Sequence, residues 1–338
     1  MAGPEDILCS IVIPVHDRAD LTAQCLAAIR ENTGDVPYDV LVVDNGSTDS
    51  TTEFLAGLRS PFRSVRNEEN LGFGRASNQG ADATSGQYIL FLNNDTVPLP
   101  GWLGPMVECM ESRPEVGIVG AKLLYPDSGL MQHAGVAVGE GHPFHVYKML
   151  PADLPEACED RDCDAVTGAC MLVRRSLFEE LGGFDVAYLN GLEDIDLCMR
   201  ARELGYISRF SSRSIVQHYE SMTEGRMDNN DRNHEVFKER WPASSRPCAL
   251  SPGNFLALAG VRLLKIDEQG DKFVLFCRET FMKCDRCPWV IRPYHNRLRY
   301  YAARLYYSLR YIKYWGQVRR TIREAERLAA GRRGGPGE

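Results

Sequence analysis

Polar side chains that could bind a ligand follow three apolar runs, at the points where those runs end. The run "YILFL" (88–92) leads directly into two amides and a carboxylate, with no turn glycine between them. A strand ending in a turn would explain one such cluster, because Asn and Asp hydrogen-bond their own backbone. Three clusters on neighbouring parallel strands instead indicate one shared pocket beyond the carboxyl ends of the strands. The clusters are Pro14, His16, Asp17 and Arg18; Asp44 and Asn45; and Asn93, Asn94 and Asp95.

The residues after the first run exclude two common phosphate-binding motifs. A dinucleotide fingerprint or a P-loop needs glycines there, and "PVHDRADL" contains none. Gly72, Gly74 and Gly80 in "GFGRASNQG" have the wrong spacing for either motif. A phosphate ligand would then need another source of positive charge. Mg²⁺ or Mn²⁺ on Asp95 could supply it, because hard cations bridge carboxylates and phosphate oxygens.

The elements that must position these clusters alternate between strand and helix. This alternation predicts an α/β fold with a largely parallel sheet. The second half predicts a strand at 117–125, an irregular excursion over 126–163, and a strand that turns into a helix ending at Gly182 and Gly183. A helix that begins with acidic residues near 193 and a strand from 207 follow. The first strands are expected at 10–15, 39–45, 63–67 and 88–92.

The C-terminal part differs in composition, so we expect a catalytic domain at 1–240 and an extension at 241–338. From Pro288 onward there are 12 Arg or Lys and 3 Glu, although the whole chain carries −7. A basic, aromatic helix is expected at 297–328. It could lie on an anionic membrane surface, pair with a second copy, or pack on the catalytic domain. The acidic body argues against nucleic acid.

The bulk composition indicates an ordinary globular protein. The chain has 338 residues, 44% of them hydrophobic, and no apolar run long enough to span a bilayer. We expect no signal peptide. Most of the 11 cysteines lie in apolar runs, which favours reduced thiols in a cytoplasm. The single C-x-x-C at Cys284–Cys287 is expected to be a structural turn; zinc would need two more ligands, such as Cys277 or His295.

Four ordered motifs together resemble the family-2 glycosyltransferases, in the style of bacterial rhamnosyltransferase-like enzymes of surface polysaccharide assembly. They are "SIVIPVHDRADLTAQCLAAI", "VLVVDNGSTDST", "NLGFGRASNQGADATSGQYILFLNNDT" and "YLNGLEDIDLCMRARELGY", within residues 8–222. The resemblance implies the GT-A nucleotide-diphospho-sugar transferase fold, a Rossmann-like, mostly parallel sheet flanked by helices, with a largely helical C-terminal extension. It also implies inverting, metal-assisted transfer of a hexosyl or deoxyhexosyl group to a hydroxyl of a glycan or lipid-linked saccharide. The enzyme would then be cytoplasmic, either free or peripheral at the inner face of the cell membrane.

The same resemblance assigns roles to individual residues. The metal-binding D-x-D motif falls on Asn93–Asp95, where Asn93 replaces the first acid and only Asp95 keeps a charge. His218 would complete the metal shell for Mg²⁺ or Mn²⁺. Asp194 would be the general base, in the acid pair with Glu193 at the start of a helix. Donor contacts are implied for Pro14, His16, Asp17, Asp44, Asn70, Gly72, Asn78, Asn93 and Asn94.

Two other functions remain open at this point. The substitution at Asn93 is compatible with a degenerate member that binds a nucleotide sugar or scaffolds a partner. A sugar nucleotidyltransferase also uses crossover sheets and metal, but it should carry a glycine-rich basic loop after the first strand. His133, His142 and His145 are assigned acceptor-side roles, and Asp196 is expected on the helix face or supporting its neighbours. No motif names the sugar, the nucleotide or the acceptor.

Overall fold

A computed structural model of the chain describes residues 7–34, 36–126, 128–139, 142–148, 152–153, 157–219 and 230–242, and two strands at 261–266 and 273–277. The chain divides into two compact units, Met1–Pro247 and Cys248–Glu338. In the second unit, β13 (Val261–Ile266) and β14 (Phe273–Cys277) form an antiparallel pair. The helix expected at 297–328 and the motif at Cys284–Cys287 lie outside the described residues.

The first unit is built on a ten-stranded sheet in the order β10-β12-β6-β11-β4-β1-β2-β3, with β5 paired to β12 and β7 paired to β6. Hairpin β8–β9 pairs separately. The strands are β1 (Cys9–Val15), β2 (Tyr38–Asn45), β3 (Phe62–Asn67), β4 (Tyr88–Leu92), β5 (Thr96–Pro98), β6 (Val116–Leu124), β7 (Met131–His133), β8 (Val136–Gly139), β9 (His142–His145), β10 (Arg161–Cys163), β11 (Cys170–Arg174) and β12 (Ile207–His218).

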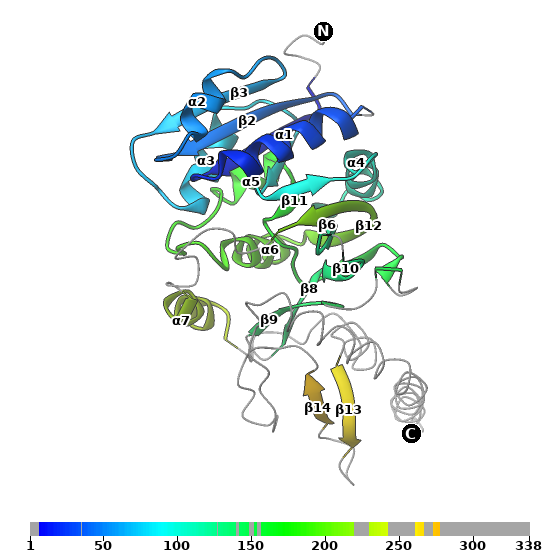
Figure 1. The fold of residues 1–338 in the computed structure, drawn as a ribbon. Coiled ribbons are helices and arrows are strands. Elements are labelled where there is room, and N and C mark those ends of the chain that lie inside the picture. Colours follow the sequence, from blue (N-terminus) through cyan, green and yellow to red (C-terminus); the bar gives the residue numbers. More distant parts are fainter. Residues whose placement is uncertain are drawn as a thin grey trace. The chain divides into compact units, whose positions relative to one another are not determined.

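Helices cover both faces of this sheet, which confirms the predicted α/β architecture (Figure 1). One hydrophobic cluster joins the sheet to α1, α2 and α4, and the other joins it to α3, α5, α6 and α7. Because successive strand residues point to opposite faces, Ile11 and Ile13 lie in the first cluster and Val12 in the second. The helices are α1 (Ala19–Asn32), α2 (Thr51–Ala56), α3 (Phe73–Asp82), α4 (Leu103–Glu111), α5 (Arg175–Glu180), α6 (Glu193–Glu203) and α7 (Asn230–Arg240).

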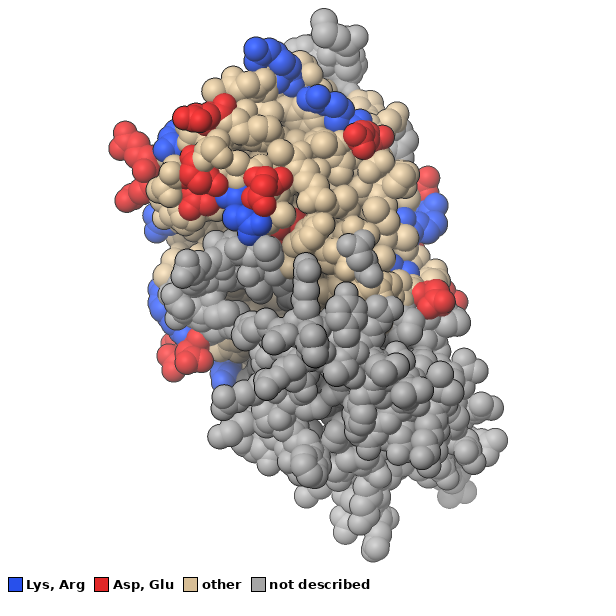
Figure 2. Space-filling view, viewed as in Figure 1, with Lys and Arg blue, Asp and Glu red and all other residues tan. Residues whose placement is uncertain are grey.

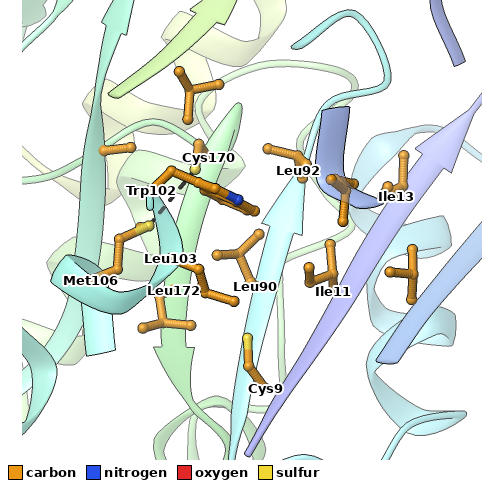
Figure 3. Close-up of a cluster of buried hydrophobic side chains, with 14 of the residues drawn as sticks. Cys9, Ile11, Ile13, Leu90, Leu92, Trp102, Leu103, Met106, Cys170 and Leu172 are labelled. Atoms are coloured by element: carbon orange, nitrogen blue, oxygen red, sulfur yellow. Dashed lines mark hydrogen bonds between the residues drawn. The ribbon is translucent and has the colours of Figure 1, made fainter. Parts of the chain in front are cut away.

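Trp102 anchors the first cluster beneath the strand ends that carry polar residues. Its indole lies among side chains of β4 and β11, including Leu92 and Cys170 (Figure 3). The Nε1–H donates to Thr33 Oγ1 at 2.8 Å, so this buried polar group is satisfied. The start of α4 is therefore fixed over the carboxyl end of β4. This strand ends at Leu92, the residue before Asn93.

The expectation of an irregular excursion over 126–163 was wrong in part. This stretch contains β7 and the β8–β9 hairpin, and it ends in β10, which pairs with β12. Each of these strands has only three or four residues. Strands this short do not show the alternation of apolar and polar residues by which longer strands are predicted.

Strand β12 contains a bulge that divides it into two halves. Ser211 pairs with Ala121 and Ile215 pairs with Lys122, so three residues of β12 have no counterpart in β6. Asp160, just before β10, stabilises the bulge, because its Oδ1 accepts Ser212 N at 2.7 Å. The tip half of β12 runs on to His218.

The surface of the described residues carries mixed charge. Figure 2 shows acidic and basic side chains interspersed over the described part of one face. Among the described residues, none of the helices is both long enough and apolar enough to traverse a lipid bilayer.

Gly80 allows α3 to approach the sheet closely. A Cβ at this position would lie 2.3 Å from Val12 Cγ1 and 3.1 Å from Val43 Cγ2. Both valines are buried strand residues with stiff χ1 angles, so neither side chain can move away easily. The close contact brings the beginning of α3 against the carboxyl ends of β1 and β2.

We expect Gly80→Ala to lower the free energy of unfolding by up to about 2 kcal/mol. Overpacking costs about 1–3 kcal/mol, and roughly 1 kcal/mol is regained because Ala favours the helix over Gly. Urea denaturation measures the difference. Gly34→Ala is the matched control, because a Cβ there meets nothing within 4 Å. Equal denaturation midpoints for the two variants would contradict the close approach.

Candidate active site

The sheet topology gathers the predicted site residues at one edge. Strands β1, β2, β4, β6 and β12 run in the same direction, because β11 is antiparallel to both β4 and β6. His218 at the end of β12 therefore lies at the same edge as the polar ends of β1, β2 and β4. Residues just before β11 also lie there, since Cys170 pairs with Leu92. Five separated segments of the chain thus meet at the carboxyl edge.

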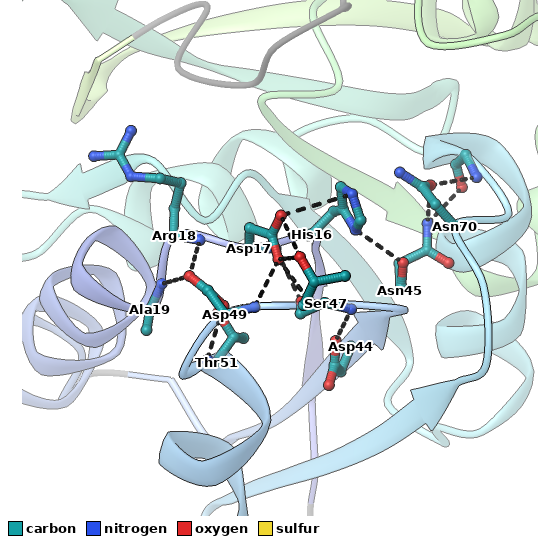
Figure 4. Close-up of polar contacts among 12 residues, drawn as sticks. His16, Asp17, Arg18, Ala19, Asp44, Asn45, Ser47, Asp49, Thr51 and Asn70 are labelled. Carbon is teal, nitrogen blue, oxygen red and sulfur yellow. Dashed lines mark hydrogen bonds and ion pairs between the residues drawn. The ribbon is translucent and has the colours of Figure 1, made fainter.

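Two carboxylates join the turn after β1 to the turn after β2 (Figure 4). Asp17 Oδ1 accepts the backbone N–H of Thr48 at 2.6 Å and of Asp49 at 3.2 Å. In return, Asp49 Oδ2 accepts the N–H of Arg18 at 2.8 Å and of Ala19 at 3.3 Å. Asp49 thereby caps α1, whose own N-cap, Arg18, makes no side-chain cap bond.

The turn after β1 adopts a backbone conformation that is uncommon for its residues. Asp17 and Arg18 have φ of 60° and 65°. Such angles persist for non-glycine residues only where the surroundings hold them, and the reciprocal carboxylate bonds do so here. His16 Nδ1 donates to Asn45 O at 3.2 Å, and Pro14 lies within β1 opposite Val43. The predicted first-strand cluster is thus a rigid turn facing the end of β2.

Asp44 holds the turn after β2 from inside. Its carboxylate accepts Ser47 N at 2.9 Å, Thr52 Oγ1 at 2.9 Å and the guanidinium of Arg66. Burial by itself would raise the pKa of Asp44, but these hydrogen bonds outweigh burial and lower it. The sequence did not point to Arg66, which enters from β3. The predicted contact of Asp44 with a nucleotide base stays a prediction.

Asn45 organises the loop before α3. Its Nδ2 donates to Asn70 Oδ1 at 2.8 Å, and its Oδ1 accepts Leu71 N at 3.0 Å. Asn70 Oδ1 also accepts Gly72 N at 2.9 Å. Gly72 has φ of 82°, which glycine adopts at little cost. Two predicted donor residues, Asn70 and Gly72, therefore lie beside the end of β2.

Asn78 connects α3 to the turn after α5. Its Nδ2 donates to Phe184 O and its Oδ1 accepts Phe184 N, both at 2.9 Å. A Cβ on Gly183 would lie 2.6 Å from Asn78 Oδ1, so the turn needs glycine there. Both amide atoms of Asn78 thus bond the backbone of Phe184, and its predicted donor contact stays a prediction.

Asp95 and His218 lie against each other, as a shared cation site requires. Asp95 Oδ1 is 3.1 Å from His218 Nε2, and both side chains are largely buried. The pairing of β5 with β12 sets this arrangement, because it places His218 opposite Thr96. Asn94 Nδ2 donates to Thr22 Oγ1 at 3.0 Å, which fixes the turn to α1.

Gln132 fixes the orientation of the His218 ring. His218 Nδ1 donates to Gln132 Oε1 at 2.5 Å, and Gln132 Nε2 donates to His218 O at 3.3 Å. Asn93 Nδ2 lies 3.3 Å from His218 Nε2 and can donate to it. The Nε2 lone pair then faces Asp95 and Asn93. Sequence reasoning missed Gln132, because it lies in the stretch that was predicted to be irregular.

The acid pair begins α6, as predicted. Asp194 Oδ2 accepts Gly168 N at 2.7 Å and its Oδ1 accepts Ile195 N at 2.8 Å, an arrangement that stabilises a charged carboxylate. Gly168 lies just before β11, so this bond places Asp194 at the carboxyl edge. Glu193 is buried, and its Oε2 accepts Gly191 N at 2.6 Å.

A histidine pair lies close to these groups. His133 Nδ1 is 2.8 Å from His145 Nδ1, and His133 is fully buried. Burial, with the nearby charges of His145, Arg161 and His218, lowers the pKa of His133 well below its ordinary value. The side chain of His142 lies outside the described residues, and the predicted acceptor-side roles of all three histidines stay predictions.

Asp196 supports its neighbours, in agreement with one of the two expectations for it. It is fully buried, and it accepts Arg200 Nε at 2.7 Å, Trp241 Nε1 at 3.0 Å and the Tyr188 hydroxyl at 3.2 Å. Across the described part of the chain, no three or more His, Cys, Asp or Glu side chains cluster to hold a metal ion. The predicted role of Asp95 and His218 as metal ligands stays a prediction.

The chain is similar in sequence to known proteins. The chain is 36% identical over 221 residues to the O-antigen biosynthesis protein RfbC of Myxococcus xanthus, covering 63% of this chain and 17% of that protein. It is 26% identical over 212 residues to the N-acetylglucosaminyl-diphospho-decaprenol L-rhamnosyltransferase of Mycobacterium tuberculosis, covering 56% and 69%. The chain thus spans less than a fifth of the first relative.

A solved structure supports the fold. The mannosyltransferase PcManGT of Pyrobaculum calidifontis, in complex with GDP-Man and Mn²⁺, superposes with a TM-score of 0.52 at 19% identity, covering 73% of this chain and 66% of that one. Residues 10–182 match the family described as glycosyl transferase family 2. This match covers half of the chain and includes the turns after β1, β2 and β4. The chain therefore belongs to glycosyl transferase family 2.

Proposed function

We propose that this chain is an inverting glycosyltransferase that moves a sugar from a nucleoside diphosphate to a hydroxyl acceptor, with the help of a divalent cation. The observation that carries the proposal is the meeting of Asp95, His218 and Asp194 with the turns after β1 and β2 at one sheet edge. Ligands of such sheets bind at this edge. The membership of family 2 and the GDP-Man in the solved structure support a nucleotide-sugar donor.

The Asp95–His218 pair fits Mg²⁺ or Mn²⁺. Two ligands at right angles, each about 2.1 Å from a cation, lie about 3 Å apart, and the pair is separated by 3.1 Å. Gln132 orients the His218 imidazole so that Nε2 faces the Asp95 carboxylate. Metal-binding histidines are commonly oriented in this way, by a hydrogen bond from the ring nitrogen that does not bind the metal. Diphosphate oxygens and water would complete the coordination. A bound cation would supply Lewis-acid stabilisation of the departing diphosphate.

Asp194 is proposed as the general base. Its carboxylate takes the proton of the acceptor hydroxyl while that oxygen forms a bond to the anomeric carbon. The bond from this carbon to the diphosphate breaks with its electron pair on the leaving oxygen, and attack from the opposite face inverts the configuration. Two backbone N–H groups hold the carboxylate in place, and an ionised carboxylate can accept a proton. Glu193 contributes by holding Gly191 in the preceding turn.

The donor would lie along the turns of the first three parallel strands. His16, Asp17, Asn70 and Gly72 line this part of the edge through their mutual bonds with the end of β2. The turn after β1 is closed by His16, Asp17 and Arg18 rather than by glycines, which disfavours a sugar nucleotidyltransferase. A degenerate binding protein is the alternative that the substitution at Asn93 keeps open.

The acceptor is proposed to be a glycan or a lipid-linked saccharide. The printed names of the two relatives refer to O-antigen biosynthesis and to a diphospho-decaprenol substrate. The basic segment after Pro288 is suited to an anionic membrane surface at the cytoplasmic side, or to pairing with a second copy. Both roles of this segment stay predictions.

Asp194→Asn is expected to abolish hydrolysis of the nucleotide sugar, while binding of the donor is kept. Loss of a general base costs about 10²–10⁴-fold in rate. Release of nucleoside diphosphate into water is measured over a panel of UDP-, GDP- and dTDP-sugars with Mn²⁺, and binding by thermal shift with UDP, GDP and dTDP. Glu108→Gln, in a surface pair with Arg213, is the control. If the wild-type chain binds a nucleotide but releases no diphosphate from any donor, the binding-protein alternative holds.

Asp95→Asn and His218→Ala are expected to remove the part of nucleotide binding that depends on Mn²⁺. The Mn²⁺-dependent thermal shift with nucleoside diphosphate should disappear in both variants, because a ligand stabilises only the state it binds. Gln132→Leu should weaken Mn²⁺ affinity by about 10–100-fold through loss of ring orientation. A full Mn²⁺-dependent shift in Asp95→Asn would refute the cation site.

A further inference from the structure

The segment just before the acid pair has an unusual backbone. Asn190, Gly191 and Leu192 have φ of 56°, 151° and 72°, three positive values in succession. Two of these residues carry side chains, for which such angles are unfavourable unless neighbouring groups impose them. Leu192 is also the residue from which α6 begins, since its carbonyl accepts Asp196 N at 2.9 Å. The conformation of this segment therefore sets the direction in which α6 presents Glu193 and Asp194.

Two asparagines from different parts of the fold hold this segment. Asn233, a buried residue of α7, bonds both backbone groups of Leu189: its Oδ1 accepts Leu189 N at 3.0 Å and its Nδ2 donates to Leu189 O at 2.8 Å. One residue later, Asn190 Oδ1 accepts Phe73 N at 2.9 Å. Phe73 begins α3, whose N-cap is Gly72 and has no capping side chain. Asn190 therefore acts as a remote cap for α3.

These bonds form a continuous connection between the two sides of the proposed site. Gly72 and Asn70 lie on the proposed donor side, next to Phe73. On the other side, the Phe73 ring approaches Asp194: a Cβ on Gly168 would lie 3.3 Å from both Phe73 Cζ and Asp194 Cβ. Gly168 itself donates to Asp194. A displacement of Asn190 would thus move the beginning of α3 and the acid pair relative to each other.

We propose that Asn190 and Asn233 are positioning residues that set the Asp194 carboxylate relative to the bound donor. The proposal rests on the proposed role of Asp194 as base. The two asparagines act through the backbone, because they fix residues 189–192 between α3 and α7. Their loss acts on the rate of the chemical step, because misplacement of a catalytic group by about 1 Å costs up to about a hundredfold.

Asn190 offers a matched pair of variants. Asn190→Gly accepts the positive φ but removes the cap on Phe73 N, whereas Asn190→Asp keeps an oxygen acceptor and suits the N-terminus of a helix. The kcat is that for release of nucleoside diphosphate from the donor. We expect Asn190→Gly to lower it by about 10–100-fold, with the donor KM within about twofold of wild type. Asn190→Asp is expected to keep the wild-type kcat. Ser112→Ala is the control, since Ser112 Oγ makes a comparable bond to a backbone carbonyl, Cys109 O at 2.7 Å, at the end of α4 and away from the site.

A second measurement is independent of activity. Amide hydrogen exchange of the whole chain, read by mass spectrometry, is expected to be about tenfold faster in residues 71–76 of both Asn190→Gly and Asn233→Leu, although Asn233 lies on α7. Unchanged exchange in residues 71–76, or a kcat of Asn190→Gly equal to that of Ser112→Ala, would overturn the proposal. If Asp194→Asn keeps full release, the proposed base fails, and exchange in 71–76 still decides whether the two asparagines connect α3 to α7.

Discussion

The pairing of β5 with the tip of β12 is the contact on which the site depends. It involves only three residue pairs, Val216 with Pro98, Gln217 with Val97 and His218 with Thr96. Through it, the turn that carries Asp95 and the imidazole of His218 meet, although 123 residues separate them in sequence. Because β12 also runs parallel to β6, its end reaches the same edge as β1, β2 and β4. The register of the sheet thus brings the Asp95 carboxylate and the His218 imidazole together at this edge.

The acidic residues at this edge divide into two groups by what they contact. Asp17, Asp44 and Asp49 accept backbone N–H groups and hold the turns after β1 and β2 in shape. Asp95 instead lies beside an imidazole, and Asp194 begins a helix against the residue before β11. Carboxylates of the first group stabilise turns that contain no glycine cradle. The proposed site therefore combines turns held by carboxylates, where the donor is proposed to bind, with two further carboxylates, Asp95 and Asp194, that are proposed to take part in the reaction.

Much of this arrangement could be predicted from sequence, because the central strands are continuous apolar runs and the helices carry apolar residues at helical spacing. The polar ends of β1, β2 and β4 follow such runs. The acids that begin α6 were found as the start of a helix, and the family resemblance supplied their predicted role. Gln132 and Asn233 could not be found, since each bonds a residue far away in sequence, His218 and Leu189 respectively. Strands β7 to β10 were too short to show a period. Sequence patterns therefore do not reveal side chains, such as Gln132 and Asn233, that orient residues distant in sequence.

The bulge in β12 has a consequence for how the site tolerates change. The two halves of this strand pair with β6 in separate registers, one ending at Ser211 and the other starting at Ile215. Side chains alternate between faces along a strand, so a one-residue slip would normally turn His218 to the opposite face. Here residues 212–214 separate the two halves, so a slip confined to the first half would leave the pairing of the tip half with Lys122–Leu124 and with β5 in place. The direction of the His218 imidazole is therefore set locally, by the last four residues of the strand.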